Sequence, residues 1–184
     1  NTNEAYAIAK ISGIKLCEFY NKQYSKTHKI DYRSVMPTNL YGFGDNYDDK
    51  TSHVIPGLIN RIYNAKIQNQ KQVKIWGSGK AKREFLFVDD LAEACVFVMN
   101  LDTEKFKLAT HGSNYFLNIG SGEEVSIKEL AKTISKIIGF NGDLIFDLSM
   151  PDGTPRKILD SNKIRKLGWN PKVSLFNGIE KTYK

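Results

Sequence analysis

Apolar residues recur along the chain with two different spacings. Helical spacing of three and four residues predicts helices over about 5–24, 53–62, 91–101, 127–138, 162–168 and 175–183. Short apolar runs between turn residues predict strands over 31–36, 73–76, 83–88, 116–119 and 144–146. Helices and short strands alternate throughout, and this alternation predicts an α/β fold.

Residues that cap helices sharpen several of these boundaries. Ser126 and Glu129 form a capping box, and Gly139 ends the helix that starts there. Further N-caps are expected at Ser52, Asp89–Asp90, Ser161 and Ser174.

Glycine-rich segments predict turns. Gly77-Ser78-Gly79 separates two strands, so we expect a hairpin there. Gly120-Ser121-Gly122 does not continue into G-x-G-x-x-G, because Val125 occupies the last glycine position, and we expect a turn and not a dinucleotide site. Loops are expected over 37–42, 43–51, 102–114 and 151–157.

Length and composition restrict the class of protein. A chain of 184 residues is long enough for one domain or a large part of one. No apolar run approaches the roughly 20 residues that cross a bilayer, so no membrane segment is expected. Cys17 and Cys95 lack C-x-x-C spacing and nearby histidines, which argues against a disulfide or a metal site. We expect both to be buried small hydrophobic residues in a reducing compartment.

The net charge of +7 and the pI near 9.3 raise the question of an anionic partner. The lysines are scattered along predicted helix surfaces, and no nucleic-acid-binding motif accompanies them. Nucleic acid is therefore not expected as a partner. A small phosphorylated ligand accounts for a few of the basic residues equally well.

Tyr6 and Lys10 are the first candidate chemical groups. They stand four positions apart in a run of good helix formers, so both project from one face of a helix. An ammonium next to a phenol stabilises the phenolate and suits the tyrosine to proton transfer near neutral pH. The alternative is a helix that carries an exposed Tyr and Lys by chance, and the pair alone does not decide between the two.

Other candidates lie in the predicted loops. Pro37-Thr38-Asn39-Leu40 follows a strand, and ligands bind at strand ends in open α/β sheets. The segments 80–83 and 155–157 carry arginines that suit phosphates. His53 lies at a loop-to-helix junction, where a lone histidine is more often a surface or capping residue than a catalyst.

These motifs occur in an order that resembles the GDP-L-fucose synthases of the extended short-chain dehydrogenase/reductase superfamily. The motifs are Tyr-x-x-x-Lys, Met-Pro-Thr-Asn-Leu-Tyr-Gly, Ser-His-Val-Ile-Pro, Trp-Gly-Ser-Gly-x-x-x-Arg-Glu-Phe, Val-Asp-Asp-Leu-Ala and Pro-Asp-Gly-Thr-Pro-Arg-Lys. The resemblance covers essentially the whole chain. Tyr-x-x-x-Lys is shared by many nucleotide-sugar enzymes, whereas Ser-His-Val-Ile-Pro and Pro-Asp-Gly-Thr-Pro-Arg-Lys are more particular.

The resemblance implies an enzyme that epimerises C3 and C5 of GDP-4-keto-6-deoxy-D-mannose and then reduces the C4 ketone with NADPH. Tyr6 would protonate the C4 oxygen and steady the enolate. Lys10 would hold the nicotinamide ribose and lower the pKa of Tyr6. His53 would deliver a proton to the sugar carbon during epimerisation. The 4-ketone acidifies the protons at C3 and C5, so one site can serve all three steps.

Binding residues are also implied by the resemblance. Lys10, Pro37, Thr38, Asn39, Leu40 and His53 would contact the NADP cofactor. Asn39, Arg61, Trp76, Arg83 and Asp152 would surround the GDP part of the substrate, with Trp76 against a base or sugar face and Arg83 on a diphosphate. No residue is expected to bind a metal.

The family's glycine-rich turn, catalytic serine and cysteine base have no counterpart in this sequence. We therefore expect the C-terminal portion of such an enzyme, inactive alone. Residues 1–50 would complete a Rossmann-like NADP domain, and 51–184 would form mainly the substrate domain, with about 84–101 returning to the Rossmann sheet. The resemblance also implies a cytoplasmic homodimer.

Two other functions remain open. A sister nucleotide-sugar epimerase, reductase or dehydratase would share Tyr6 and Lys10 but would not need His53. A non-catalytic GDP-sugar binding module would keep the basic loops and make Tyr6 incidental.

Overall fold

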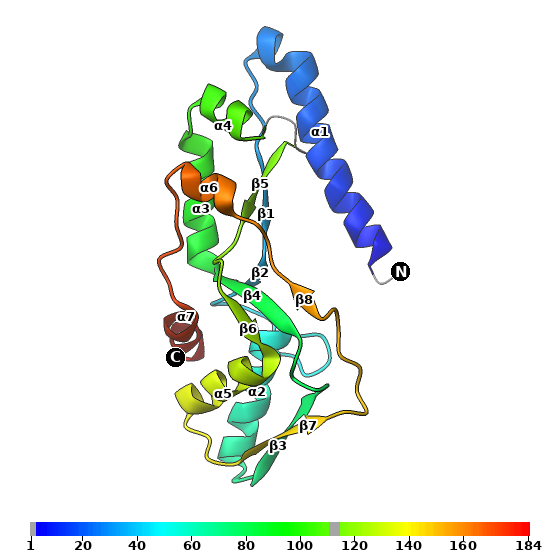
Figure 1. The fold of residues 1–184 in the computed structure, drawn as a ribbon, viewed down its shortest axis with the longest axis vertical. Coiled ribbons are helices and arrows are strands. Elements are labelled where there is room, and N and C mark those ends of the chain that lie inside the picture. Colours follow the sequence, from blue (N-terminus) through cyan, green and yellow to red (C-terminus); the bar gives the residue numbers. More distant parts are fainter. Residues whose placement is uncertain (1–2, 111–114) are drawn as a thin grey trace.

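The computed structural model describes residues 3–110 and 115–184 (Figure 1). The helices are α1 (Glu4–His28), α2 (Val54–Ile67), α3 (Val88–Asn100), α4 (Thr103–Thr110), α5 (Ile127–Ile138), α6 (Asn162–Lys166) and α7 (Leu175–Tyr183). The strands are β1 (Ser34–Pro37), β2 (Asn39–Tyr41), β3 (Gln72–Trp76), β4 (Lys82–Phe87), β5 (Phe116–Ile119), β6 (Glu124–Ser126), β7 (Asp143–Asp147) and β8 (Arg156–Lys157). Helices alternate with mainly parallel strand pairs, which confirms the predicted α/β fold.

The described strands form separate small sheets. β1 pairs with β5, and β3 pairs with β7, both in parallel. Between them, β4 pairs with β2 and β8 in parallel and with β6 in antiparallel orientation. β4 is therefore the central strand of the molecule, as Figure 1 shows.

The segments 72–83 and 143–157 run side by side in the same direction, because β7 pairs with β3 and β8 pairs with β4. The hairpin expected at Gly77-Ser78-Gly79 is therefore wrong. A glycine-rich turn shows where the chain bends, but the partner of each strand comes from a distant segment that the local sequence does not reveal.

Two clusters of buried apolar side chains meet at β4. Phe85 and Phe87 belong to a cluster that includes α2, α5 and β3, whereas Leu86 belongs to a cluster that includes α3, α4 and β5. Successive side chains of a strand point to opposite faces, so one strand supplies both cores. Burial of this kind stabilises a fold by about 25 cal/mol per Å² of apolar surface.

Helix α1 lies at the side of the molecule, and its N-terminal end stands clear of the strands (Figure 1). Asn21 is its one buried residue among those described, whereas Ile8, Ile11 and Phe19 are more than half exposed. The sequence places the helix end near Tyr24, but α1 continues to His28 because the polar residues after Tyr24 are compatible with a helix. It ends at Lys29, which adopts a left-handed conformation with φ 53°.

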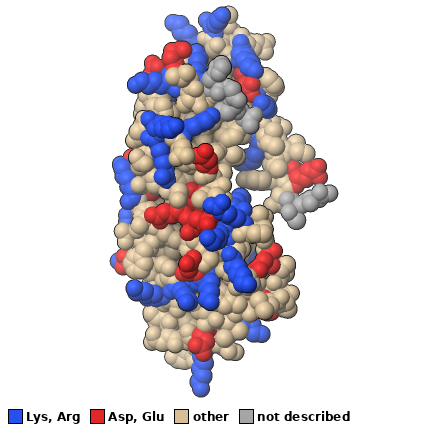
Figure 2. All heavy atoms as spheres, viewed as in Figure 1, with Lys and Arg blue, Asp and Glu red and all other residues tan. Residues whose placement is uncertain are grey.

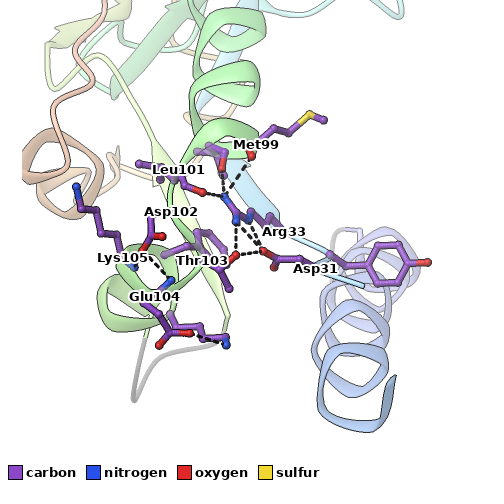
Figure 3. A network of polar contacts seen from close by, with 12 residues as sticks. Asp31, Arg33, Met99, Leu101, Asp102, Thr103, Glu104 and Lys105 are labelled. Atoms are coloured by element: carbon purple, nitrogen blue, oxygen red, sulfur yellow. Dashed lines mark hydrogen bonds and ion pairs between the residues drawn. The ribbon is translucent and has the colours of Figure 1, made fainter. Parts of the chain in front are cut away.

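The junction of α3 and α4 is held by Arg33 (Figure 3). Its guanidinium donates to the carbonyl oxygens of Val98 and Leu101 at 2.5 and 2.7 Å and to Asp31 Oδ2 at 2.6 Å. Helix α4 corrects the loop expected over 102–114, since Asp102 Oδ1 accepts two backbone N–H groups and starts a helix. Residues 111–114 of that loop lie outside the described part of the chain.

Helix caps follow the local sequence in part. The capping box of Ser126 and Glu129 and the cap at Ser174 are confirmed by their hydrogen bonds. Ser161 occupies the N-cap position of α6 without a side-chain hydrogen bond. The caps expected at Ser52 and Asp89–Asp90 are wrong, because α2 and α3 start after His53 and Phe87.

Asp90 binds the backbone before α7 and does not cap α3. It is buried, and its carboxylate accepts the backbone N–H groups of Lys172 and Val173 at 3.2 and 3.0 Å. This side chain therefore fixes the segment before α7 and not the start of α3.

Three further observations concern the cysteines, membrane-spanning helices and metal sites. Cys17 and Cys95 are free cysteines, and both are half-buried, whereas the sequence predicts full burial. Over residues 3–110 and 115–184, no helix combines the length and apolarity needed to cross a membrane. The same residues contain no group of three or more His, Cys, Asp or Glu arranged to hold a metal ion.

Candidate functional site

Tyr6 and Lys10 lie on one face of α1, as their spacing predicts. Lys10 Nζ is 5.5 Å from the centroid of the Tyr6 ring, and the Tyr6 side chain is 65% exposed. Neither side chain forms a hydrogen bond or an ion pair with the described residues. The pair is therefore formed within α1 itself and is open to a ligand.

Residues 37–40 connect two sheets and do not form the loop that the sequence predicts. Pro37 ends β1 and Asn39 begins β2, so only Thr38 lies between the strands. The backbone N–H of Thr38 donates to Ile119 O at 2.9 Å. The Thr38 hydroxyl and the Asn39 amide both donate to Glu84 O, at 3.1 and 2.8 Å. A short rigid connection thus replaces the expected loop.

Glu84 supports this connection and was not identified from the sequence. Its side chain is fully buried, and its two carboxylate oxygens accept the backbone N–H groups of Gly122 and Leu159 at 2.7 and 2.9 Å. Such bonds satisfy a charge that would otherwise be costly to bury. The available signal was an acidic residue directly before the apolar run Phe85-Leu86-Phe87 of β4.

Gly120-Ser121-Gly122, where the sequence predicts a turn, lies in the connection between β5 and β6 and packs against protein. A Cβ atom on Gly120 would lie 2.3 Å from Glu84 Oε1, and one on Gly122 would lie 2.2 Å from Arg165 Nη2. Gly122 also has a positive φ of 74°. The glycines therefore admit two charged side chains, and they do not form an open cradle for phosphates.

His53 immediately precedes α2, and its side chain is exposed. Its backbone occupies the N-cap position, but its imidazole forms no hydrogen bond with the described residues. The capping role considered from the sequence is thus not performed by the side chain. The ring is left accessible for proton transfer to a ligand.

Arg61 and Trp76 form a stacked pair at the end of β3. The guanidinium carbon of Arg61 is 5.0 Å from the Trp76 ring centroid, and its Nη1 donates to Lys74 O at 3.2 Å. Trp76 is still 55% exposed. This arrangement holds an aromatic face at the surface next to a positive charge.

Asp152 and Arg83 lie beside the turn that follows Trp76. The Asp152 carboxylate accepts the backbone N–H and hydroxyl of Ser78 at 2.8 and 2.6 Å. These bonds, the hydroxyl first, lower the pKa of Asp152 below its ordinary value. Arg83 Nη1 donates to Lys82 O and Thr154 O at 2.8 and 2.6 Å. The structure therefore brings Trp76, Arg83 and Asp152 together around one turn.

Basic side chains continue along β8. Arg156 and Lys82 both pair with Glu124, Lys82 at 3.0 Å, and these hydrogen bonds, Arg156 first, lower the pKa of Glu124. Figure 2 shows that Lys and Arg side chains form several separate groups on this face, with acidic groups between them. The charge thus offers local anion sites instead of one continuous basic surface.

The described residues fit only part of the NADP cofactor that the resemblance implies. The Lys10 ammonium, which contacts the Tyr6 ring but forms no ion pair with the described residues, suits its nicotinamide end, as does the rigid connection of residues 37–40. The β5–β6 connection at 120–122 does not suit its phosphates, because Glu84 and Arg165 occupy the space beside its glycines.

Comparison with protein families identifies a match over much of the chain. A model described as the NAD dependent epimerase/dehydratase family matches residues 1–120. This segment contains Tyr6, the connection 37–40, His53, Trp76 and Arg83.

Individual relatives match nearly the whole chain. GDP-L-fucose synthase of Escherichia coli (strain K12) is 51% identical over 183 residues, which cover 100% of this chain and 56% of the relative. GDP-L-colitose synthase of Yersinia pseudotuberculosis is 39% identical over 182 residues, which cover 99% of this chain and 56% of the relative. The chain therefore spans about half the length of these curated relatives.

A solved structure shows the same fold. The crystal structure of a GDP-L-fucose synthetase from Naegleria fowleri bound to NADP has a TM-score of 0.87 and 29% identity, and covers 99% of this chain and 55% of that chain. These similarities confirm the resemblance inferred from the motifs and the Rossmann-like fold class.

Proposed function

This chain belongs to the NAD dependent epimerase/dehydratase family. We propose that it is the C-terminal portion of a GDP-L-fucose synthase, the enzyme that converts GDP-4-keto-6-deoxy-D-mannose to GDP-L-fucose. The observation that supports this most is the group of Trp76, Arg83 and Asp152 around one turn, beside the Arg61 stack. An aromatic face next to an arginine suits a nucleoside diphosphate.

Tyr6 is the proposed acid for the C4 oxygen. The phenol is exposed, and the Lys10 ammonium stands over its ring at 5.5 Å. A positive charge at this position favours the phenolate when the proton leaves. The same group would stabilise the enolate oxygen during epimerisation.

His53 is the proposed proton donor to the sugar carbon. Its ring is exposed and has no hydrogen-bond partner in the described chain, so its proton is free for transfer. An imidazole can both donate and accept a proton, which suits acid-base chemistry.

Cofactor binding involves the nicotinamide end in this proposal. Lys10 would hold the ribose, and Pro37, Thr38, Asn39, Leu40 and His53 would line the ring. NADPH supplies the hydride for reduction at C4. Asn39 would also contact the substrate, through the amide oxygen that its hydrogen bond to Glu84 O leaves available.

The domain boundaries, the cellular location and the oligomeric state are also part of the proposal. Residues 1–50 would belong to a cofactor domain, and 51–184 mainly to a substrate domain, with 84–101 shared. The active protein would be a cytoplasmic homodimer with both epimerase and reductase activity.

A GDP-sugar binding module is the second candidate. It is favoured by one observation. Arg61 stacks on Trp76, and hydrogen bonds to other segments hold Arg83 and Asp152, whereas the side chains of Tyr6 and Lys10 form no hydrogen bond or ion pair with the described residues outside α1. A sister enzyme is distinguished by His53, because replacing this residue in such an enzyme would leave its chemistry intact.

Calorimetric titration of the 184-residue chain with GDP, and separately with NADPH, tests the proposal. We expect GDP to bind and NADPH to bind weakly, with no NADPH-dependent reduction by this chain alone. Absence of GDP binding would contradict the proposal. Reduction of the 4-keto sugar by the isolated chain would contradict the expectation that it is inactive alone.

A further inference from the structure

The sequence contains two Asn-Gly pairs, and the structure places them in opposite surroundings. Asn177-Gly178 lies within α7, whereas Asn141-Gly142 lies in the connection between α5 and β7, which runs along the outside of the molecule (Figure 1). An asparagine followed by glycine is prone to deamidation, because glycine has no side chain to hinder attack of its own nitrogen on the asparagine amide. The two pairs therefore share one chemistry and differ in their environment.

Both reacting groups of the first pair are accessible. Asn141 is exposed, and its side chain forms no hydrogen bond with the described residues. The N–H of Gly142 likewise donates to none of the residues that the structure describes. No hydrogen bond within this part of the chain has to break before the Gly142 nitrogen attacks the Asn141 amide carbon.

The second pair is protected by the fold. Gly178 is buried, and its N–H donates to Ser174 O at 2.9 Å as part of α7. A Cβ atom on Gly178 would lie 2.1 Å from Tyr41 Oη, so the helix packs closely against β2 at this point. Attack on Asn177 requires α7 to open locally, and such opening costs free energy.

Packing also requires the glycine at position 142. A Cβ atom there would lie 2.4 Å from Phe140 Cζ and 2.6 Å from Lys71 O. A larger residue would force the Lys71 backbone to move. The fold therefore retains, next to Asn141, the residue that leaves the attacking nitrogen unhindered.

The charges around the pair favour the attack. Asn141 and Gly142 line a surface hollow together with Lys66, Lys71 and Asp143. Two ammonium groups and one carboxylate thus face this hollow, and their net positive charge favours the deprotonated form of the Gly142 nitrogen, which is the nucleophile.

From these observations we propose that Asn141 is a site of spontaneous deamidation. The Gly142 nitrogen bonds to Asn141 Cγ, the Cγ–Nδ2 bond breaks, and the amide group leaves as ammonia with the proton of the Gly142 N–H. Water then opens the cyclic imide at either carbonyl and gives aspartate or isoaspartate. The reaction needs no oxidant or cofactor, and it is independent of the proposed function.

Isoaspartate at position 141 would weaken the pairing of β7 with β3. It adds one atom to the main chain between Phe140, whose N–H donates to Ser135 O at 3.0 Å, and Asp143, whose N–H donates to Lys71 O at 2.9 Å. Both ends of this short connection are fixed. The additional atom therefore loosens the first residue pair of the two strands, Gln72 with Asp143.

Peptide mapping by mass spectrometry tests the proposal on the 184-residue chain, incubated folded at weakly alkaline pH. We expect Asn141 to deamidate about tenfold faster than Asn177 or more, because only Asn177 needs local opening. In guanidinium chloride the two rates should become similar, since α7 no longer protects Asn177. Equal rates in the folded chain, or no reaction at Asn141, would overturn the proposal. A preference for Asn141 that persists unchanged in guanidinium chloride would overturn its structural explanation.

The matched control is Asn141→Gln, whose longer side chain disfavours ring closure. This variant should lose the deamidation signal at position 141 and keep the rate at Asn177. Amide hydrogen exchange tests the effect on β7. The Asp143 N–H should exchange faster in the isoaspartate form than in the unmodified chain, and incubated Asn141→Gln should show no change. Unchanged exchange in the isoaspartate form would overturn the effect on β7.

Discussion

Asn21 binds the backbone of Tyr32 through both ends of its amide. Its Nδ2 donates to Tyr32 O at 2.6 Å, and its Oδ1 accepts Tyr32 N–H at 2.8 Å. Tyr32 lies two residues before β1, which leads directly into the connection 37–40. One buried side chain therefore ties the helix of Tyr6 and Lys10 to the strand that carries the proposed nicotinamide contacts.

Replacement of Asn21 tests this tie. We expect Asn21→Ala to lower the free energy of unfolding by about 2 kcal/mol, because a backbone N–H and C=O lose their partners. Urea denaturation measures the loss. Gln23→Ala on the exposed side of the same helix is the control and should change stability by less than about 0.5 kcal/mol. Equal effects of the two changes would contradict the assignment.

Glu84 should be among the least replaceable residues. Glu84→Ala leaves two buried backbone N–H groups without acceptors and opens space beside Gly120, so we expect a loss of about 3 kcal/mol. Glu84→Gln retains the shape of the side chain, but its NH2 group then lies against one of the two backbone N–H groups. We expect a loss of stability between that of Glu84→Ala and none. Thermal unfolding followed by circular dichroism ranks the stability of the two variants and the unsubstituted chain. A fully stable alanine variant would show that the carboxylate is not needed.

The Asp31–Arg33 contact predicts a dependence on pH. Burial disfavours the Asp31 carboxylate, but hydrogen bonds from Arg33 and Thr103 outweigh burial and lower its pKa. A lowered folded-state pKa adds stability above the unfolded value of about 3.9, and this stability is lost as the pH falls through the folded-state pKa.

Unfolding measured between pH 7 and 3 should therefore show a smaller decline in Asp31→Asn than in the unsubstituted chain. Asp143→Asn, at an exposed position of β7 with no ion pair among the described residues, serves as the control. If the decline is unchanged in Asp31→Asn, the contact does not contribute to acid sensitivity.

Trp76 should report nucleotide binding by its fluorescence. It is 55% exposed, whereas Trp169 is 3% exposed, so added GDP should quench chiefly Trp76. Trp76→Ala should weaken GDP binding about tenfold, in line with stacking energies of roughly 1–3 kcal/mol per base. Leu148→Ala changes another exposed apolar residue and should have no effect. Full GDP affinity in Trp76→Ala would exclude stacking on this ring.

Local signals predicted those features whose partners lie close in the chain. Ser126 and Glu129 are three residues apart, so the capping box depends on a single turn of helix. Tyr6 and Lys10 are likewise neighbours on one helix face. The hairpin at 77–79 failed because β3 and β4 each pair with a segment far along the chain.

The sequence by itself therefore determined the α/β class, most helices and the identity of the candidate side chains, because these depend on periodicity and residue chemistry within short stretches. Only the tertiary structure decided which of them meet. Asp152 reaches Ser78, Glu84 reaches Gly122 and Leu159, and Asn21 reaches Tyr32 across separations that no local pattern encodes. These contacts form because each buried or turn-forming polar group needs a partner, and packing of the distant segments alone determines which partner is near.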